Sequence, residues 1–232
     1  MRHGQTDFNV ERRFQGVIDH PLNAHGRAQA LDAGRVLAKR ILAPSAQLGM
    51  AKIVETAGRV TLMCSPLSRA FDTASIIAGE LAALGADLRG PVVDERFLER
   101  SYGSFEGMTA AEAQDQYPEW VAEWRETGES AGAGIERSDL VGERMRAAAE
   151  EAAAGMSEDA TLVVVSHGSA ITRALLTFMG LDPLSFDALR GLDNCHWSEL
   201  VHMGGGGSGA SGPARWRLVA HNIGHREDVL GA

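Results

Sequence analysis

The chain has 232 residues, 44% of them hydrophobic and 23% charged, and a net charge of −9 at pH 7. These values are ordinary for a soluble globular protein with a substantial core, and the negative charge argues against nucleic acid as a partner. Two cysteines, Cys64 and Cys195, are too few for a disulfide framework and lack metal-ligand spacing. No apolar run resembles a secretory signal or a membrane span, so we expect a cytoplasmic protein without a membrane partner.

Apolar spacing in the first half of the chain predicts a helix, an irregular connection, a strand, a second helix and a minimal strand. We place them at residues 23–42, 43–58, 60–64, 67–84 and 92–93. Ser65 and Pro66 follow the first strand. Because serine favours the N-cap and proline the first turn, we expect Ser65 to cap the second helix.

The second half continues the alternation after a mixed stretch. A short helix is predicted at 109–116, and Trp120 and Trp124 are spaced to share one helix face, where core packing is the simplest role. Then follow a helix, the clearest buried strand and another helix, at 137–154, 161–165 and 168–179. The last elements are two strands of a hairpin, 196–201 and 215–220, joined by a Gly/Ser-rich stretch at 204–213.

Continuous apolar strands that alternate with helices favour an α/β fold. We expect a three-layer α/β/α sandwich with a mostly parallel central sheet. No internal repeat is present, and too little chain follows the Gly/Ser stretch to fold alone, so we predict one domain over residues 1–232.

Two histidines and two arginines are candidates for chemistry. Arg2 and His3 open the chain, and His167 lies at the carboxyl end of the clearest strand, immediately before a helix. This is where open α/β sheets bind ligands, beside helix amides that suit anions. Arg69, in the first turn of its helix, should reach the same edge. Such a cluster is suited to an anion, because arginine matches phosphate oxygens.

A carboxyl group must protonate the leaving group in such a site, and Glu99 and Glu106 are the candidates. Each residue taken alone also has an ordinary explanation. His167 fits a capping or core residue, Arg69 a solvated helix residue, and Arg2-His3 a disordered terminus. The other histidines show no metal-ligand spacing, and no metal site is expected.

Several motifs occur in a fixed order: RHGQTDFN at the N-terminus, Gln15-Gly16, SPLSRAFDTA around Arg69, ERFLERSYGSFEG around Glu99, and VVSHG at His167. In this order and across essentially the whole chain, they resemble the histidine phosphatase superfamily, also called the phosphoglycerate-mutase-like family. The resemblance implies the sandwich fold and phosphoryl transfer through a phosphohistidine, with no metal or other cofactor.

The resemblance also implies a role for each matched position. His3 is the expected nucleophile, neutral at its attacking nitrogen and held at the other by a backbone carbonyl. Glu99 is the expected proton donor. The residues expected to bind the phosphate or substrate are Arg2, Gly4, Asn9, Gln15, Gly16, Arg69 and His167, with Gly4 allowing close packing beside the imidazole.

Hydrolysis is expected rather than mutase activity. The mutases carry His, Asn and Lys after the Glu99 position and a basic insertion, whereas residues 118–138 here hold five Glu and two Arg. The segments DNCHWSEL and RWRLVAHN are similar to the actinobacterial glucosyl-3-phosphoglycerate phosphatases, which makes a phosphorylated glycerate glucoside the expected substrate. A broad-specificity phosphatase of small phosphomonoesters, a mutase and a non-catalytic phospho-ligand binder are the alternatives. Apolar residues on the hairpin would suit a homodimer.

Only Met1 precedes Arg2-His3-Gly4 in this sequence. In the family that the chain resembles, this triad ends a buried apolar strand, so the resemblance implies that the first strand is missing here. We therefore expect a less preorganised nucleophile.

Overall fold

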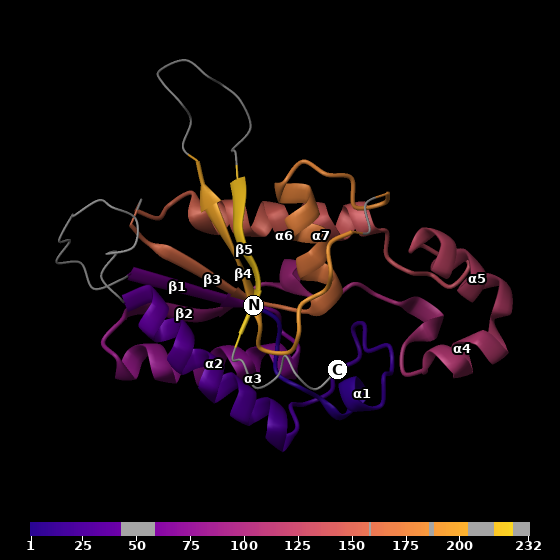
Figure 1. Cartoon of the computed structure of the whole chain (residues 1–232), viewed down its shortest axis with the longest axis horizontal. Coiled ribbons are helices and arrows are strands. Elements are labelled where there is room, and N and C mark those ends of the chain that lie inside the picture. Colours follow the sequence, from indigo (N-terminus) through magenta and orange to yellow (C-terminus); the bar gives the residue numbers. More distant parts are fainter. Residues whose placement is uncertain (43–58, 158, 186–187, 204–215, 225–232) are drawn as a thin grey trace, which may run out of the picture.

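Three parallel strands form the centre of the computed structural model (Figure 1). They are β1 (Arg59–Cys64), β2 (Asp87–Val93) and β3 (Thr161–Val165), in the order β2-β1-β3. The structure describes residues 1–42, 59–157, 159–185, 188–203 and 216–224, and the connection predicted at 43–58 and the Gly/Ser stretch lie outside them. β2 is longer than the two residues predicted for it. Most of its side chains are not buried, so the sequence carries no apolar pattern from which its full length could be predicted.

Helices cover both faces of the sheet. On one side lie α2 (Ala24–Leu42) and α3 (Ser68–Ala83), and on the other α6 (Ser138–Ala153) and α7 (Gly168–Phe178) (Figure 1). Apolar side chains of α2, α3, β1 and β3 make one buried cluster, and those of α6 and α7 make a second. The predicted three-layer sandwich with a parallel sheet is confirmed.

The start of α3 differs from the prediction. The helix begins at Ser68, its N-cap is Leu67, and Ser65 does not cap it. Instead, the Asp19 carboxylate accepts hydrogen bonds from the Ser68 N–H and hydroxyl, both at 2.8 Å. A residue about fifty positions upstream therefore caps this helix, which the local sequence could not show.

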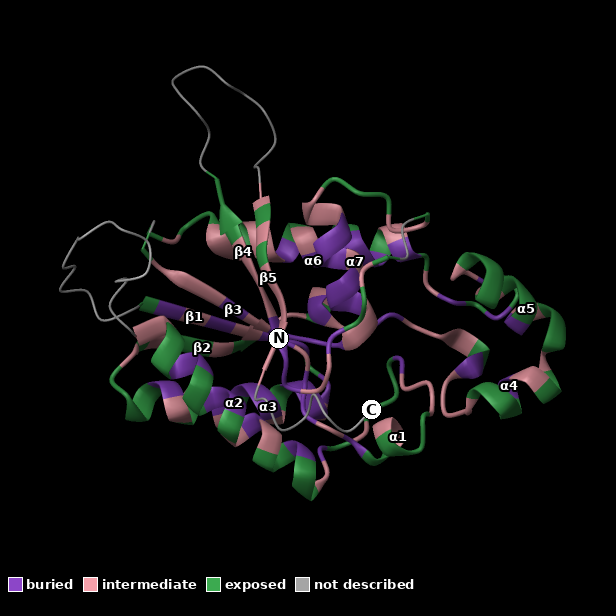
Figure 2. Cartoon of the chain, viewed as in Figure 1, coloured by how far each residue is buried: buried purple, intermediate pink, exposed green. Residues whose placement is uncertain are grey.

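Short elements extend the sandwich at one end. Near the N-terminus lies α1 (Asp7–Val10), and after η1 (Glu95–Phe97) and η2 (Gly103–Phe105) come α4 (Ala110–Gln116) and α5 (Pro118–Thr127). Trp120 and Trp124 pack in an aromatic cluster around the buried Phe105, as predicted. Figure 2 shows that α4 and α5 are otherwise largely exposed, whereas buried residues gather around the N-terminus.

The predicted hairpin is present as β4 (Trp197–His202) and β5 (Trp216–Ile223), which pair antiparallel. Met1 to His3 lie between this hairpin's base and β3. Met1 O accepts from Ser166 N at 2.9 Å, and His3 N donates to Ser166 O at 3.0 Å. On the other side, Arg2 N donates to His196 O at 2.9 Å. These bonds fix the beginning of the triad from both sides, and the less preorganised nucleophile expected from the sequence stays a prediction.

Candidate functional site

His3 is buried, and its imidazole is oriented by its own neighbour. Nδ1 lies 2.7 Å from Gly4 O, so Nδ1 carries the proton and Nε2 keeps its lone pair. This is the predicted carbonyl contact. Burial lowers the pKa of His3 well below 6.5, and the charges of Arg69 and Arg2 lower it further. The ring is therefore neutral and nucleophilic at neutral pH.

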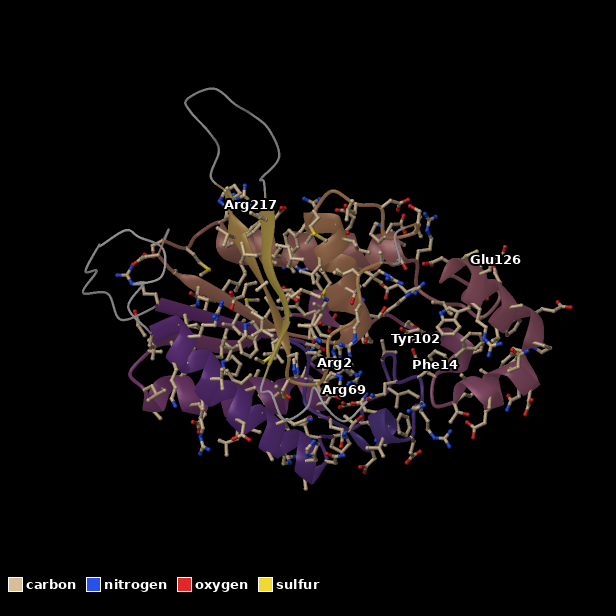
Figure 3. All side chains as sticks on the ribbon, in the orientation of Figure 1. Arg2, Phe14, Arg69, Tyr102, Glu126 and Arg217 are labelled. Atoms are coloured by element: carbon tan, nitrogen blue, oxygen red, sulfur yellow. The ribbon has the colours of Figure 1, made fainter. Side chains whose placement is uncertain are left out.

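Arg2 and Arg69 lie beside each other next to the carboxyl ends of the strands (Figure 3). Arg2 donates through Nη1 to Leu192 O at 2.6 Å, while its buried Nε has no hydrogen-bond partner among the described residues. Burial lowers the pKa of Arg69 to about 10, so it stays protonated at neutral pH. The buried cation of Arg69, the partly buried cation of Arg2 and its unpaired Nε–H favour an anion, because an anion would supply the missing charge and acceptor.

His167 joins this cluster, with its ring centroid 5.1 Å from that of His3. Its Nδ1 accepts from Arg69 Nε at 3.2 Å, so Nε2 donates to Ser65 Oγ at 2.8 Å. Burial and the charge of Arg69 lower the pKa of His167 well below 6.5. Both ring nitrogens are thus engaged by protein atoms, and His167 is one of the groups that hold the Arg69 guanidinium in position.

Arg69 also fixes the loop that follows Gln15. Its two terminal nitrogens donate to Ile18 O at 2.7 Å and Gly16 O at 2.8 Å. Gly16 has a φ of +51°, and a side chain there would run into the Glu106 carboxylate. Gly16 therefore lies at the site and contributes its backbone carbonyl, which accepts from Arg69.

Gly4 allows a close approach of two backbone segments. A Cβ at Gly4 would lie 2.3 Å from Gly26 O, so the missing side chain lets the start of α2 pack against the segment that carries His3. Its N–H donates to Thr73 Oγ1 at 3.1 Å, and that hydroxyl donates to Arg69 O at 2.7 Å. Thr73, whose role sequence analysis missed, ties the segment that carries His3 to α3.

Asn9 and Gln15 are brought together by Thr6. The Thr6 hydroxyl lies 3.1 Å from Gln15 Oε1 and 3.2 Å from Asn9 Oδ1. Asn9 is the third residue of α1, and Thr6 and Asn9 form a capping box that fixes this short helix. The two amides thus lie on one side of the segment that carries His3.

Glu99 is buried, and its carboxylate lies against the first turn of α7, the helix that begins directly after His167. Its Oε1 accepts from Ala170 N and Arg100 N, both at 2.8 Å, and its Oε2 accepts from Ser169 N at 3.2 Å. Arg144 holds the same loop, because it donates to the carbonyl oxygens of Arg96, Leu98 and Glu99. A rigidly held carboxyl group therefore lies at the edge of the cationic cluster.

Glu106, the other candidate acid, is held by hydrogen bonds that connect two loops. Its Oε1 accepts from Tyr102 N at 2.9 Å, from Ser101 Oγ at 3.1 Å and from Val17 N at 3.2 Å. The carboxylate thus joins the Gly16–Val17 loop to η2. Of the two glutamates, Glu99 is the one whose charge acts on both Arg2 and Arg69, and it stays the candidate for proton transfer.

Metal ligation finds no support in the described part of the chain, where no three His, Cys, Asp or Glu side chains gather to hold an ion. Likewise, none of its helices has the length and apolar character needed to cross a membrane. The positive charge at the site comes from arginine.

Comparison with known proteins agrees with this geometry. Residues 1–211 match the model of the histidine phosphatase superfamily (branch 1). The chain is 32% identical over 229 residues to glucosyl-3-phosphoglycerate phosphatase of Mycobacterium tuberculosis, covering 96% of this chain and 92% of the relative. It is 30% identical to a probable phosphoglycerate mutase, GpmB, of Serratia proteamaculans, over 87% and 83% of the two chains.

A solved structure is similar over nearly the whole chain. Mycobacterial glucosyl-3-phosphoglycerate phosphatase in complex with VO3 superposes with a TM-score of 0.75 and 31% identity, covering 95% of this chain and 96% of that one.

Proposed function

The chain belongs to the histidine phosphatase superfamily, and on that premise we propose that His3 is the nucleophile of a phosphomonoester hydrolase. The observation that carries the proposal is the buried, neutral imidazole of His3, with Nδ1 bound to Gly4 O and the cations of Arg2 and Arg69 beside it. Phosphatase activity itself follows from the family and its relatives.

The reaction has two steps. His3 Nε2 bonds to phosphorus while the ester P–O bond breaks, and the departing oxygen takes a proton from Glu99. Water then attacks the phosphohistidine, gives its proton to Glu99 and releases inorganic phosphate. Arg2, Arg69 and the amides of Asn9 and Gln15 are proposed to balance the charge on the phosphoryl oxygens, with Gly4 and Gly16 shaping the backbone around them and His167 holding Arg69.

The nucleophile is tested by His3→Ala. We expect hydrolysis to fall by at least about 10⁴-fold and the acid-labile phosphoenzyme to disappear, because no covalent intermediate can form. His202→Ala is the matched control, since His202 is exposed at the far end of β4, and it should behave as wild type. Near-normal turnover in His3→Ala would place the nucleophile elsewhere.

For the substrate, we propose a small phosphorylated metabolite, with glucosyl-3-phosphoglycerate as the first choice. The similarity to the mycobacterial enzymes supports this choice. An open hollow of about 250 Å³ beside Glu99 could receive the leaving group, and it is lined by Val17, Glu95, Arg96, Leu98, Glu99, Glu136 and Arg144.

Phosphoglycerate mutase activity is the second candidate, because of the similarity to the probable mutase. A panel of glucosyl-3-phosphoglycerate, 3-phosphoglycerate and p-nitrophenyl phosphate, ranked by kcat/KM with mutase activity assayed in parallel, decides between them. Release of inorganic phosphate, with glucosyl-3-phosphoglycerate preferred, supports the proposal. Isomerisation without net phosphate release supports the mutase, and binding without turnover supports a non-catalytic relative.

We further propose that residues 1–232 act as one domain in the cytoplasm and associate as a homodimer through the hairpin. Val201, Met203 and Val219 are exposed there, and apolar surface of this kind favours self-association. Light scattering of the wild type and of Val201→Glu/Val219→Glu tests the dimer, which the double variant should dissociate.

A further inference from the structure

Asn194 lies in the connection between α7 and β4, within the DNCHW segment, and touches two parts of the site at once. Its side-chain Nδ2 donates to His3 O at 3.0 Å and to Asn9 Oδ1 at 3.2 Å. The next residue, Cys195, donates its N–H to His3 O at 3.2 Å. The backbone carbonyl of the proposed nucleophile therefore receives two donors from this connection.

These contacts fix the orientation of the Asn9 amide. Its Oδ1 also accepts from Thr6 N at 3.1 Å, and a backbone N–H can only donate, so the oxygen must face Thr6 and Asn194. The Asn9 NH₂ group consequently lies on the opposite edge, where no described residue accepts from it. The orientation of Asn194 is fixed by the same logic, because both of its partners are acceptors.

The connection is itself rigidly held. Asp193 N donates to Asn222 Oδ1 at 2.9 Å, and Asn222 Nδ2 returns a bond to Asp193 Oδ2 at 2.8 Å. Leu192 O accepts from Arg2, as described above. A segment anchored by β5 on one side thus reaches Arg2, His3 and Asn9 on the other.

We propose that Asn194 is a positioning residue for phosphoryl transfer: it aims the Asn9 NH₂ group at the phosphate and fixes the backbone of His3. The inference rests on the proposed function, since it assumes that His3 attacks and that Asn9 binds the phosphoryl oxygens. Asn194 does not itself touch the reacting atoms.

The test compares Asn194→Asp with Asn194→Ala. At pH 7, the aspartate carboxylate would face His3 O and Asn9 Oδ1, and all three groups can only accept hydrogen bonds. We therefore expect kcat/KM to fall on the order of 10- to 100-fold. When the pH is lowered, protonation gives the aspartate an O–H that can donate. The Asn194→Asp rate relative to wild type should therefore recover at acidic pH, whereas the Asn194→Ala ratio stays flat.

Asp182→Asn is the matched control. It also exchanges a carboxylate and an amide, but at an exposed turn of the same connection, where Asp182 accepts from Leu184 N and Ser185 Oγ. The kcat/KM of this variant should stay within about twofold of wild type. Thermal unfolding accompanies each assay. An Asn194→Asp ratio that does not change with pH, or wild-type rates in both variants, overturns the proposal.

Phosphate binding gives a second measurement that does not need turnover. Inorganic phosphate titrated into wild type, Asn194→Ala, Asn9→Ala and the double variant should show non-additive losses, because Asn194 acts through Asn9. Additive losses overturn the proposed link, even if Asn194→Asp is unstable. Failure of the proposed function is recognised separately: His3→Ala would then retain turnover, whatever the Asn194 variants do.

Discussion

Different kinds of contact position two regions of the molecule: the segment from Met1 to Thr6, and the pair of helices α4 and α5. The first segment is held by polar bonds to distant residues: Ser166, His196, Thr73 and Asn194. The helices pack through aromatic rings that are close in sequence, such as Tyr117 on Trp120 with centroids 4.6 Å apart. Directional bonds position reacting atoms within a fraction of an ångström, whereas apolar packing mainly supplies stability. Substitutions in the two regions should therefore separate activity from stability.

After His3→Ala, Arg69→Ala should have the largest effect on turnover. It removes the donors to Gly16 O, Ile18 O and His167 Nδ1 together with one of the two proposed phosphate-binding cations. We expect kcat to fall by roughly 10²- to 10³-fold and phosphate affinity to fall with it. Arg59→Ala, which removes an exposed arginine 3.8 Å from Asp87, is the control and should leave kcat unchanged. Unchanged phosphate affinity in Arg69→Ala would contradict the assigned role.

Gly4→Ala should affect both quantities. Its Cβ would meet Gly26 O at 2.3 Å, with backbone on both sides, so His3 or α2 must move. We expect roughly a 10²-fold loss of kcat/KM and about 1–3 kcal/mol less stability by urea unfolding.

Gly79→Ala is the matched control for Gly4→Ala, because nothing lies within 4 Å of its added Cβ in the middle of α3. It should stabilise the protein by about 0.5–1 kcal/mol without changing kcat. Normal activity in Gly4→Ala would show that the close approach to α2 does not position His3.

The buried histidines predict a pH dependence of stability. His3 and His167 have pKa values lowered well below 6.5, so the unfolded chain takes up their protons first as the pH falls. The free energy of unfolding is therefore largest above pH 6.5. Below pH 6.5 it falls by about 1.4 kcal/mol per pH unit for each histidine. Urea unfolding between pH 5.5 and 7.5 measures the slope, which His167→Asn should reduce by about 1.4 kcal/mol per pH unit below pH 6.5. An unchanged slope in that variant would show that His167 does not contribute.

Trp120→Ala should have the smallest effect on chemistry. The ring stacks on Tyr117 at the outer side of the aromatic cluster, and its loss should cost about 1–2 kcal/mol of stability while kcat stays within about twofold. Kinetics at a temperature well below the midpoint check this. A large fall in kcat would mean that α4 and α5 take part in the reaction.

Sequence patterns could predict the layers and most of the proposed site. Apolar spacing placed β1, β3 and the main helices, since those elements bury regular faces. The motifs identified His3, Arg69, Glu99 and His167, which the structure brings to one place. Thr73 and Asn194 lie inside the quoted segments SPLSRAFDTA and DNCHWSEL, but their contacts with Gly4 and His3, like the capping of α3 by Asp19, could not be found in the same way. Each acts on a residue far away in the chain, and a single side chain in one sequence gives no periodic signal.

The contact between Asn194 and His3 spans 191 residues of sequence. Closing so long a loop is slow and costs chain entropy, so it depends on the rest of the sandwich being formed first. During synthesis, the residues around His3 leave the ribosome early but gain their partners only when β4 and β5 emerge. The nascent chain should thus have no activity until late in synthesis, when the hairpin docks beside His3.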